Sequence, residues 1–213
     1  MNSSPSVQIE KKVYLAGEGN NELGSWAREV PYQDGSTPGV LETLLKKVKD
    51  SGWQVVYGKK WKDIHKYKAD ENKDEDDLKG DEQSVYRACL EAEENGFNIL
   101  AFSRDIDGRQ KTHLNRMSDI EKGLSRAQTD FPSIGIIGGC ARPTIEGWVL
   151  AFSGERGTEA FSKAKAEEKL SEQGIAPKNT AQMVDFVRQY DRNNVATDAM
   201  CLNHWLNKAQ EIL

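Results

Sequence analysis

Short apolar runs alternate with amphipathic stretches along the first 140 residues of the chain. Four of the runs have strand character, at residues 12–17, 53–57, 97–103 and 134–137. Between them, apolar side chains recur at helical spacing over residues 38–48, and further helices are expected over residues 81–95, which are followed by a glycine, and over the polar stretch 111–128. Alternation of strands with helices is typical of a parallel sheet with right-handed crossovers. The pattern therefore predicts an α/β protein with a four-stranded, mainly parallel, Rossmann-like sheet and helices on both of its faces.

After Cys140 the pattern becomes helical. Pro143 suits the first turn of the first of these helices, and a Thr or Asp cap suits the start of the last one. The expected helices span residues 145–152, 159–172, 181–190 and 197–212. The chain is thus expected to comprise a flexible N-terminus (1–11), a catalytic domain (12–152) with a charged loop insertion (58–80), and a helical C-terminal region (153–213).

Composition narrows the chemistry. The chain has 213 residues, a net charge of −5, and no apolar stretch near the roughly 20 residues of a membrane helix. Its first residues lack the features of a secretory signal, and its three cysteines lack metal-ligand spacing, so a cytoplasmic protein without a membrane partner is expected. The three histidines are equally scattered. Neither a zinc site nor a serine or cysteine triad can be assembled, which leaves carboxylates as the candidate reactive groups.

Acidic residues follow two of the predicted strands. Glu18, between two glycines, follows the first strand, and Asp105 and Asp107 follow the third. Ligands of open α/β sheets bind beyond the carboxyl ends of strands, so these acids predict one acidic pocket. Glu22 lies one helical turn after Glu18 and would return to the same rim. Carboxylates that share a pocket repel unless a cation such as Mg²⁺ lies between them. The alternative is that these acids are turn formers or helix caps.

Basic residues cluster near the same predicted rim. They are candidates for contacts with nucleic-acid phosphates. They comprise Lys59, Lys60, Lys62 and Lys66 after the second strand, and Arg104, Arg109, Lys111 and Arg116 around the Asp-x-Asp turn. An alternative remains open for each group. The lysine stretch can be a solvated loop whose charge cancels against the acidic run that follows, and Arg104 can form a salt bridge with neighbouring acids.

Three motifs together resemble the Toprim domain of topoisomerases, primases, small ribonucleases and OLD-type nucleases. They are Glu18-Gly-Asn-Asn-Glu22 after one strand, Asp105-Ile-Asp107 after another, and Glu146-Gly-Trp148 on a helix after the fourth strand. The resemblance covers roughly residues 12–152. It is closest to the OLD-type nucleases and to small Toprim-like proteins of bacterial defence or mobile loci.

The resemblance implies phosphoryl-transfer chemistry on nucleic acid with Mg²⁺, for which Mn²⁺ can substitute. It assigns catalysis to Glu18, Asp105 and Asp107. It adds Glu22 and Glu146 to these three as metal ligands, with Glu18 and Asp105 placed between the ions of a two-metal site. Glu146 has an alternative as a surface residue or as an acid favoured in the first turn of a helix.

The reaction implied by the resemblance is hydrolysis, with DNA as the expected substrate. A topoisomerase needs a tyrosine nucleophile on a further domain, and a primase needs further nucleotide-handling modules, whereas a nuclease needs only the pocket. OLD-type enzymes usually carry an ATPase, but this chain has no Gly-x-x-x-x-Gly-Lys-Ser/Thr motif. A separate ATPase protein is therefore the expected partner, within an anti-phage defence system.

Two other classes remain as alternatives. The first is a non-catalytic Toprim-like module that binds DNA or a partner, with Leu202, Trp205 and Leu206 of the last helix forming either a docking face or ordinary core. The second is a haloacid-dehalogenase-type phosphohydrolase. The segment Asp105-Ile-Asp107-Gly108 resembles the catalytic motif of that family. That family normally has its motif on the first strand, whereas two strands precede it here. RNA as substrate, a single metal ion and an oligomeric state also remain open.

Overall fold

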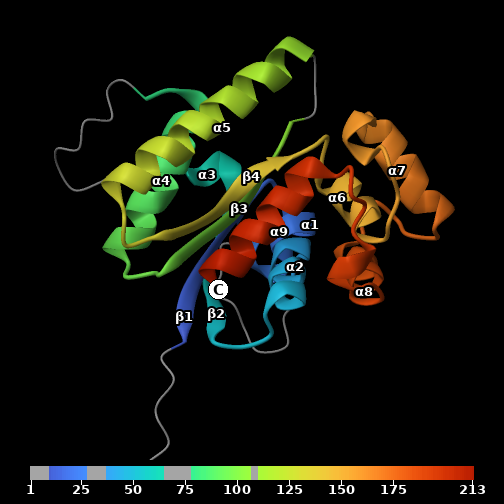
Figure 1. Ribbon diagram of the computed structural model, residues 1–213, viewed down its shortest axis with the longest axis horizontal. Helices are drawn as coiled ribbons and strands as arrows, with labels where there is room; N and C mark the ends of the chain where they lie inside the picture. Colours follow the sequence, from blue (N-terminus) through green and yellow to red (C-terminus); the bar gives the residue numbers. More distant parts are fainter. Residues whose placement is uncertain (1–9, 28–36, 65–77, 107–109) are drawn as a thin grey trace, which may run out of the picture.

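Four parallel strands form a single sheet at the centre of the molecule (Figure 1). The computed structural model describes residues 10–27, 37–64, 78–106 and 110–213. The strand order is β2-β1-β3-β4. The strands are β1 (Lys11–Gly17), β2 (Trp53–Lys60), β3 (Ile99–Asp105) and β4 (Gly135–Ala141). All three neighbouring pairs are parallel, which confirms the predicted α/β class and its four-stranded sheet.

Helices cover both faces of this sheet, as predicted (Figure 1). One face carries α3 (Trp61–Ile64), α4 (Gly80–Glu94) and α5 (Gln110–Asp130). On the other side lie α1 (Asn20–Leu23), α2 (Val40–Val48), α6 (Ile145–Phe152) and α9 (Met200–Ile212). Outside this layer, α7 (Lys163–Glu172) packs on α6 and α8 (Thr180–Arg188) packs on α2. Short 3-10 helices occupy Gly24–Ala27, Thr158–Ala160 and Arg192–Asn194.

Alternate side chains of the strands enter two separate hydrophobic cores. In β1, Val13 and Leu15 pack with α2 and α9, whereas Tyr14 and Ala16 pack with the opposite layer of α4. Successive side chains of a strand point to opposite faces, so one apolar run serves both cores. The same alternation separates the polar residues where the strands end.

The last helix belongs to the core. Leu202, Trp205 and Leu206 are buried, and the Trp205 indole Nε1–H donates a hydrogen bond of 2.9 Å to the carbonyl oxygen of Phe102 in β3. Their interpretation as a docking face is therefore wrong. None of the helices in the described ranges combines the length and apolar character needed to cross a bilayer.

Several element boundaries differ from those predicted. β2 continues to Lys60, which pairs with Gly17 of β1, and α3 follows at once, so the first part of the predicted 58–80 loop is regular structure. Pro143 lies before the N-cap of α6 rather than in its first turn. The helix expected over 159–172 starts at Lys163 because the Ser162 hydroxyl caps it.

The predicted Thr or Asp cap of the last helix is also absent. The N-cap of α9 is Ala199, which has no capping side chain. The neighbouring Asp198 carboxylate instead accepts a hydrogen bond of 2.9 Å from the backbone N–H of Gly157. The Asp198 side chain thus forms a tertiary hydrogen bond with Gly157 and does not cap α9.

Candidate functional site

The carboxyl ends of β1 and β3 lie side by side at the point where the strand order reverses. β1 and β3 are hydrogen-bonded neighbours, although β2 lies between them in sequence. The helix after β1 packs on one face of the sheet and the helices after β2 and β3 pack on the other. Such a switch point is where open α/β sheets bind their ligands. Gly17 ends β1 there, and Asp105 ends β3.

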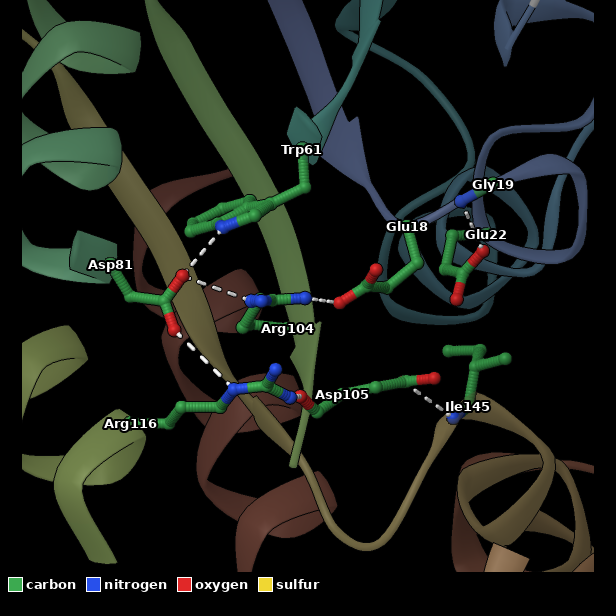
Figure 2. Close-up of polar contacts among 9 residues, drawn as sticks. All are labelled: Glu18, Gly19, Glu22, Trp61, Asp81, Arg104, Asp105, Arg116 and Ile145. Atoms are coloured by element: carbon green, nitrogen blue, oxygen red, sulfur yellow. Dashed lines mark hydrogen bonds and ion pairs between the residues drawn. The ribbon is translucent and has the colours of Figure 1, made fainter. Parts of the chain in front are cut away.

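Three carboxylates are buried near this point. Glu22 of α1, Asp105 of β3 and Glu146 of α6 have exposed fractions of 3%, 6% and 5%. Backbone amides orient two of them: Gly19 N–H donates to Glu22 Oε2 at 2.9 Å, and Ile145 N–H donates to Asp105 Oδ1 at 3.0 Å (Figure 2). Buried acids are rare unless they are paired or functional, so this cluster is the leading candidate site.

Glu146 is held by a side chain that the sequence did not single out. Asn21 of α1 donates from Nδ2 to Glu146 Oε1 at 2.9 Å, and its Oδ1 accepts from the Thr180 hydroxyl at 3.1 Å. The second carboxylate oxygen of Glu146 is buried and has no hydrogen-bond partner among the described residues. Asn21 thereby joins α1 to α6 and α8. Glu146 is a buried member of the cluster, not a surface residue.

Burial and mutual repulsion raise the pKa values of two acids in the cluster, Asp105 and Glu22. Burial, together with the charges of Glu22 and Glu146, raises the pKa of Asp105 to about 8. Burial likewise raises the pKa of Glu22 to about 7, with Glu146 again adding repulsion. The Lys163 ammonium at the start of α7 opposes both shifts. The cluster therefore retains protons near neutral pH and would release them to a bound cation.

A close approach at Gly17 sets the position of Glu22. A Cβ atom on Gly17 would lie 2.7 Å from the Cβ of Glu22, closer than real Cβ contacts allow. We expect Gly17→Ala to lower the free energy of unfolding by ~1–3 kcal/mol, because overpacking forces α1 away from the strand end. Urea denaturation measures the change.

Gly19→Ala is the matched control for this variant. Its nearest neighbour would be Glu22 Oε2, at 4.0 Å, and its φ of −169° is extended backbone that alanine adopts. We expect little change in stability. Equal losses in the two variants would contradict the role given to Gly17.

Glu18 does not join this cluster. Its carboxylate points to Arg104 and forms an ion pair with Arg104 Nη1 (Figure 2). Adjacent residues of β3 leave the strand on opposite faces, so Asp105 faces the α6 side while Arg104 lies over Trp61 on the other. The two acids expected to share metal ions thus have different partners in this structure.

Asp81, which the sequence analysis did not single out, organises the Glu18 side of the rim. It lies in the first turn of α4 and accepts hydrogen bonds at Oδ1 from Trp61 Nε1 (2.8 Å) and Arg104 Nε (3.0 Å). Its Oδ2 lies 3.9 Å from Arg116 Nε (Figure 2). Burial raises the pKa of Asp81, while the Trp61 hydrogen bond and the Arg116 charge oppose that shift. In sequence, Asp81 is indistinguishable from an ordinary first-turn acid.

The structure divides the predicted phosphate-binding residues into three groups. Lys59 lies away from the pocket, in an ion pair of 2.7 Å with the buried Glu91 carboxylate. Lys60 at the end of β2 and Lys62 in α3 lie on the same rim as Gly17, and Arg104 and Arg116 lie beside the strand ends. Outside the described residues lie Lys66, Asp107, Arg109 and the side chain of Lys111.

The described ranges contain no group of three or more His, Cys, Asp or Glu side chains arranged to hold a metal ion. Mg²⁺ commonly takes only one or two protein carboxylates, with water and substrate phosphate completing its shell. Cys89 and Cys140 are buried free thiols, and Cys201 is a partly buried one, as expected for packed cysteines.

Comparisons with models of known families, with curated proteins and with solved structures found no match.

Proposed function

We propose that this protein is a Mg²⁺-dependent, Toprim-like nuclease that hydrolyses phosphodiester bonds, with DNA as its substrate. The observation that carries the proposal is the buried pair Glu22 and Asp105 at the switch point of the sheet. Two acids with raised pKa values at such a point require a cation if both are to be ionised at neutral pH.

The residues of the cluster fit a hard divalent cation. Glu22 and Asp105 would hold it as its two protein carboxylates, with water and phosphate oxygens completing the shell. Bound there, Mg²⁺ or Mn²⁺ would neutralise charge on a phosphate and favour attack by water. Glu18 and Asp107 remain proposed catalytic residues by resemblance alone, because Glu18 is paired with Arg104 and Asp107 lies outside the described residues.

Backbone amides and one asparagine side chain orient the carboxylates of the cluster. The amides of Ile145 and Gly19 hold one oxygen each of Asp105 and Glu22, and Asn21 holds Glu146. Fixed hydrogen bonds of this kind keep carboxylates aligned without reorganisation during a reaction. Phosphodiester hydrolysis needs little more than a positioned phosphate, a positioned water and charge compensation.

The partner proposed for this nuclease is a separate ATPase protein in an anti-phage defence system. The proposal follows from the resemblance to OLD-type nucleases together with the lack of a phosphate-loop motif in this chain. Copurification with an ATPase encoded by a neighbouring gene would support it. Full activity of the isolated chain at low concentration would contradict it.

The second candidate function is a non-catalytic module that binds DNA or a partner. The ion pair between Glu18 and Arg104 favours it, since this pair holds an acid that the resemblance assigns to catalysis. Both candidates use the same rim. They differ in whether a phosphodiester bond is broken.

One panel of assays separates these functions. Supercoiled, linear and single-stranded DNA and RNA are incubated with Mg²⁺, Mn²⁺ or chelator, with and without a copurifying ATPase. We expect the wild type to cleave only with metal, and Glu22→Gln to lose at least about 100-fold in rate. Glu42→Gln, at a buried glutamate of α2 paired with Lys46, is the matched control and should retain activity.

The other outcomes of the panel identify the alternatives. Metal-independent DNA binding without cleavage under every condition would establish the binding module. Hydrolysis of p-nitrophenyl phosphate without cleavage of any nucleic acid would point to the haloacid dehalogenase class. Either result would overturn the proposed nuclease.

A further inference from the structure

Two arginines from different elements converge on the single carboxylate of Asp81. Arg104 belongs to β3 and Arg116 to α5, whereas Asp81 begins α4. The side chains are largely removed from solvent, with exposed fractions of 11% for Asp81, 13% for Arg104 and 27% for Arg116. A partly buried carboxylate between two guanidinium groups restrains both of them more than an exposed surface pair would.

Both arginines use Nε toward Asp81 and Nη1 toward the strand ends. Arg104 Nη1 contacts Glu18, the residue after β1, and Arg116 Nη1 donates to the carbonyl oxygen of Asp105 at 3.1 Å (Figure 2). Asp81 therefore holds Arg104 by a hydrogen bond and Arg116 by an ion pair of 3.9 Å, while Nη1 of each arginine lies at the rim. The guanidinium fork suits a tetrahedral phosphate, whose oxygens accept two parallel hydrogen bonds.

Trp61 completes the support of Arg104. Its ring lies under the guanidinium, with 5.6 Å from Arg104 Cζ to the ring centroid, and its Nε1–H donates to the same Asp81 oxygen as Arg104 Nε. Trp61 in turn packs on Phe102 of β3. Ring and carboxylate thus hold Arg104 from two directions.

We propose that Asp81 is a positioning residue that sets Arg104 and Arg116 as a paired clamp for a backbone phosphate of the nucleic acid beside Asp105. This inference rests on the proposed function and adds to it the residues that hold the substrate. In the free protein the Glu18 carboxylate occupies Arg104 Nη1, so the incoming phosphate exchanges with Glu18 at that nitrogen. Asp81 acts only through the arginines and touches no reacting atom.

The test combines DNA binding with cleavage kinetics. Binding of a labelled DNA duplex is followed by fluorescence anisotropy in chelator, and cleavage is measured with Mg²⁺. We expect Asp81→Asn to raise Kd and KM about tenfold with less than about a twofold change in kcat, because uniform substrate binding is lost. Asp81→Glu should restore part of the affinity. Glu18→Gln should tighten binding in chelator, because it removes the acid that competes with phosphate.

A mutant cycle separates positioning from a structural role. Because the proposal has Asp81 act through both arginines, adding Asp81→Asn to the combined variant Arg104→Gln, Arg116→Gln should weaken binding little beyond that combined variant alone. Arg116→Gln, which leaves Asp81 in place, should weaken binding by itself, so the proposal remains testable if Asp81→Asn unfolds. Asp130→Asn is the matched control, since Asp130 pairs with Arg126 Nε at 2.6 Å on the surface of α5.

Three results would overturn the inference, and they differ in what they leave standing. Additive losses in the cycle, or unchanged Kd in both Asp81→Asn and Arg116→Gln, would overturn the clamp while wild-type cleavage preserved the nuclease. Absence of both cleavage and DNA binding in the wild type would overturn the proposed function, and the clamp with it.

Discussion

Asp105→Asn is expected to abolish cleavage and, at the same time, to stabilise the metal-free protein. Asparagine keeps an oxygen for the Ile145 amide but removes the charge that would hold the cation. The loss of activity should reach about 1,000-fold, as for removal of a preorganised electrostatic group. Stability should rise because the wild type, when ionised, buries Asp105 against Glu22 and Glu146. The gain at pH 8 should be on the order of 2 kcal/mol.

A loss of activity together with a gain in stability distinguishes a functional acid from a structural one. Cleavage of the preferred substrate from the panel and urea denaturation in chelator are measured on the same preparations. Asp198→Asn is the matched control, because Asp198 also accepts a backbone N–H hydrogen bond but lies before α9, outside the buried acid cluster. It should lose stability and retain activity. A destabilised but active Asp105→Asn would refute the assignment of Asp105 to the site.

The fold was predictable because three of its strands, β1, β3 and β4, are largely buried on both faces. A strand covered on both faces does not alternate apolar with polar residues, so the run 99–103 appears in sequence as a short apolar block. The acid that follows this block marks the end of the strand. Convergence of Asp105 with Glu22 followed from the same rule, since parallel strands bring their carboxyl ends to one edge. Local pattern and topology agree at these residues.

The partners of Glu18 and Lys59 could not be predicted in the same way. Each depends on which face of the sheet a side chain takes and on which distant helix covers that face. Glu18 meets Arg104, and Lys59 meets Glu91 of α4, whose position depends on packing that no local motif encodes. The role of Asp81 was unpredictable for the same reason, because it depends on two arginines that β3 and α5 bring to its carboxylate. Long-range contacts thus decide the polar chemistry around a predictable frame.

The metal-free protein should lose stability as the pH rises from 5 to 8. The pKa of Glu22 rises from 4.5 to about 7 on folding, and that of Asp105 rises from 3.8 to about 8. In this range the folded state binds more protons than the unfolded state, so the free energy of unfolding falls with pH. The stabilisation is complete below pH about 4 and is lost as the pH passes through 7 to 8. Each proton contributes a slope of ~1.4 kcal/mol per pH unit where it is bound only in the folded state.

Urea denaturation at several pH values, in chelator and in Mg²⁺, tests this dependence. A cation that replaces the protons should flatten the profile, so Mg²⁺ should stabilise the protein more at pH 8 than at pH 6. The double variant Glu22→Gln, Asp105→Asn should show a flatter profile than the wild type and no response to Mg²⁺. Glu42→Gln should keep the wild-type slope, because Glu42 lies outside the cluster, on α2. A wild-type profile that rises between pH 5 and 8 would contradict the coupling of the buried acids, whereas a falling profile that Mg²⁺ does not alter would leave the coupling intact and refute the cation.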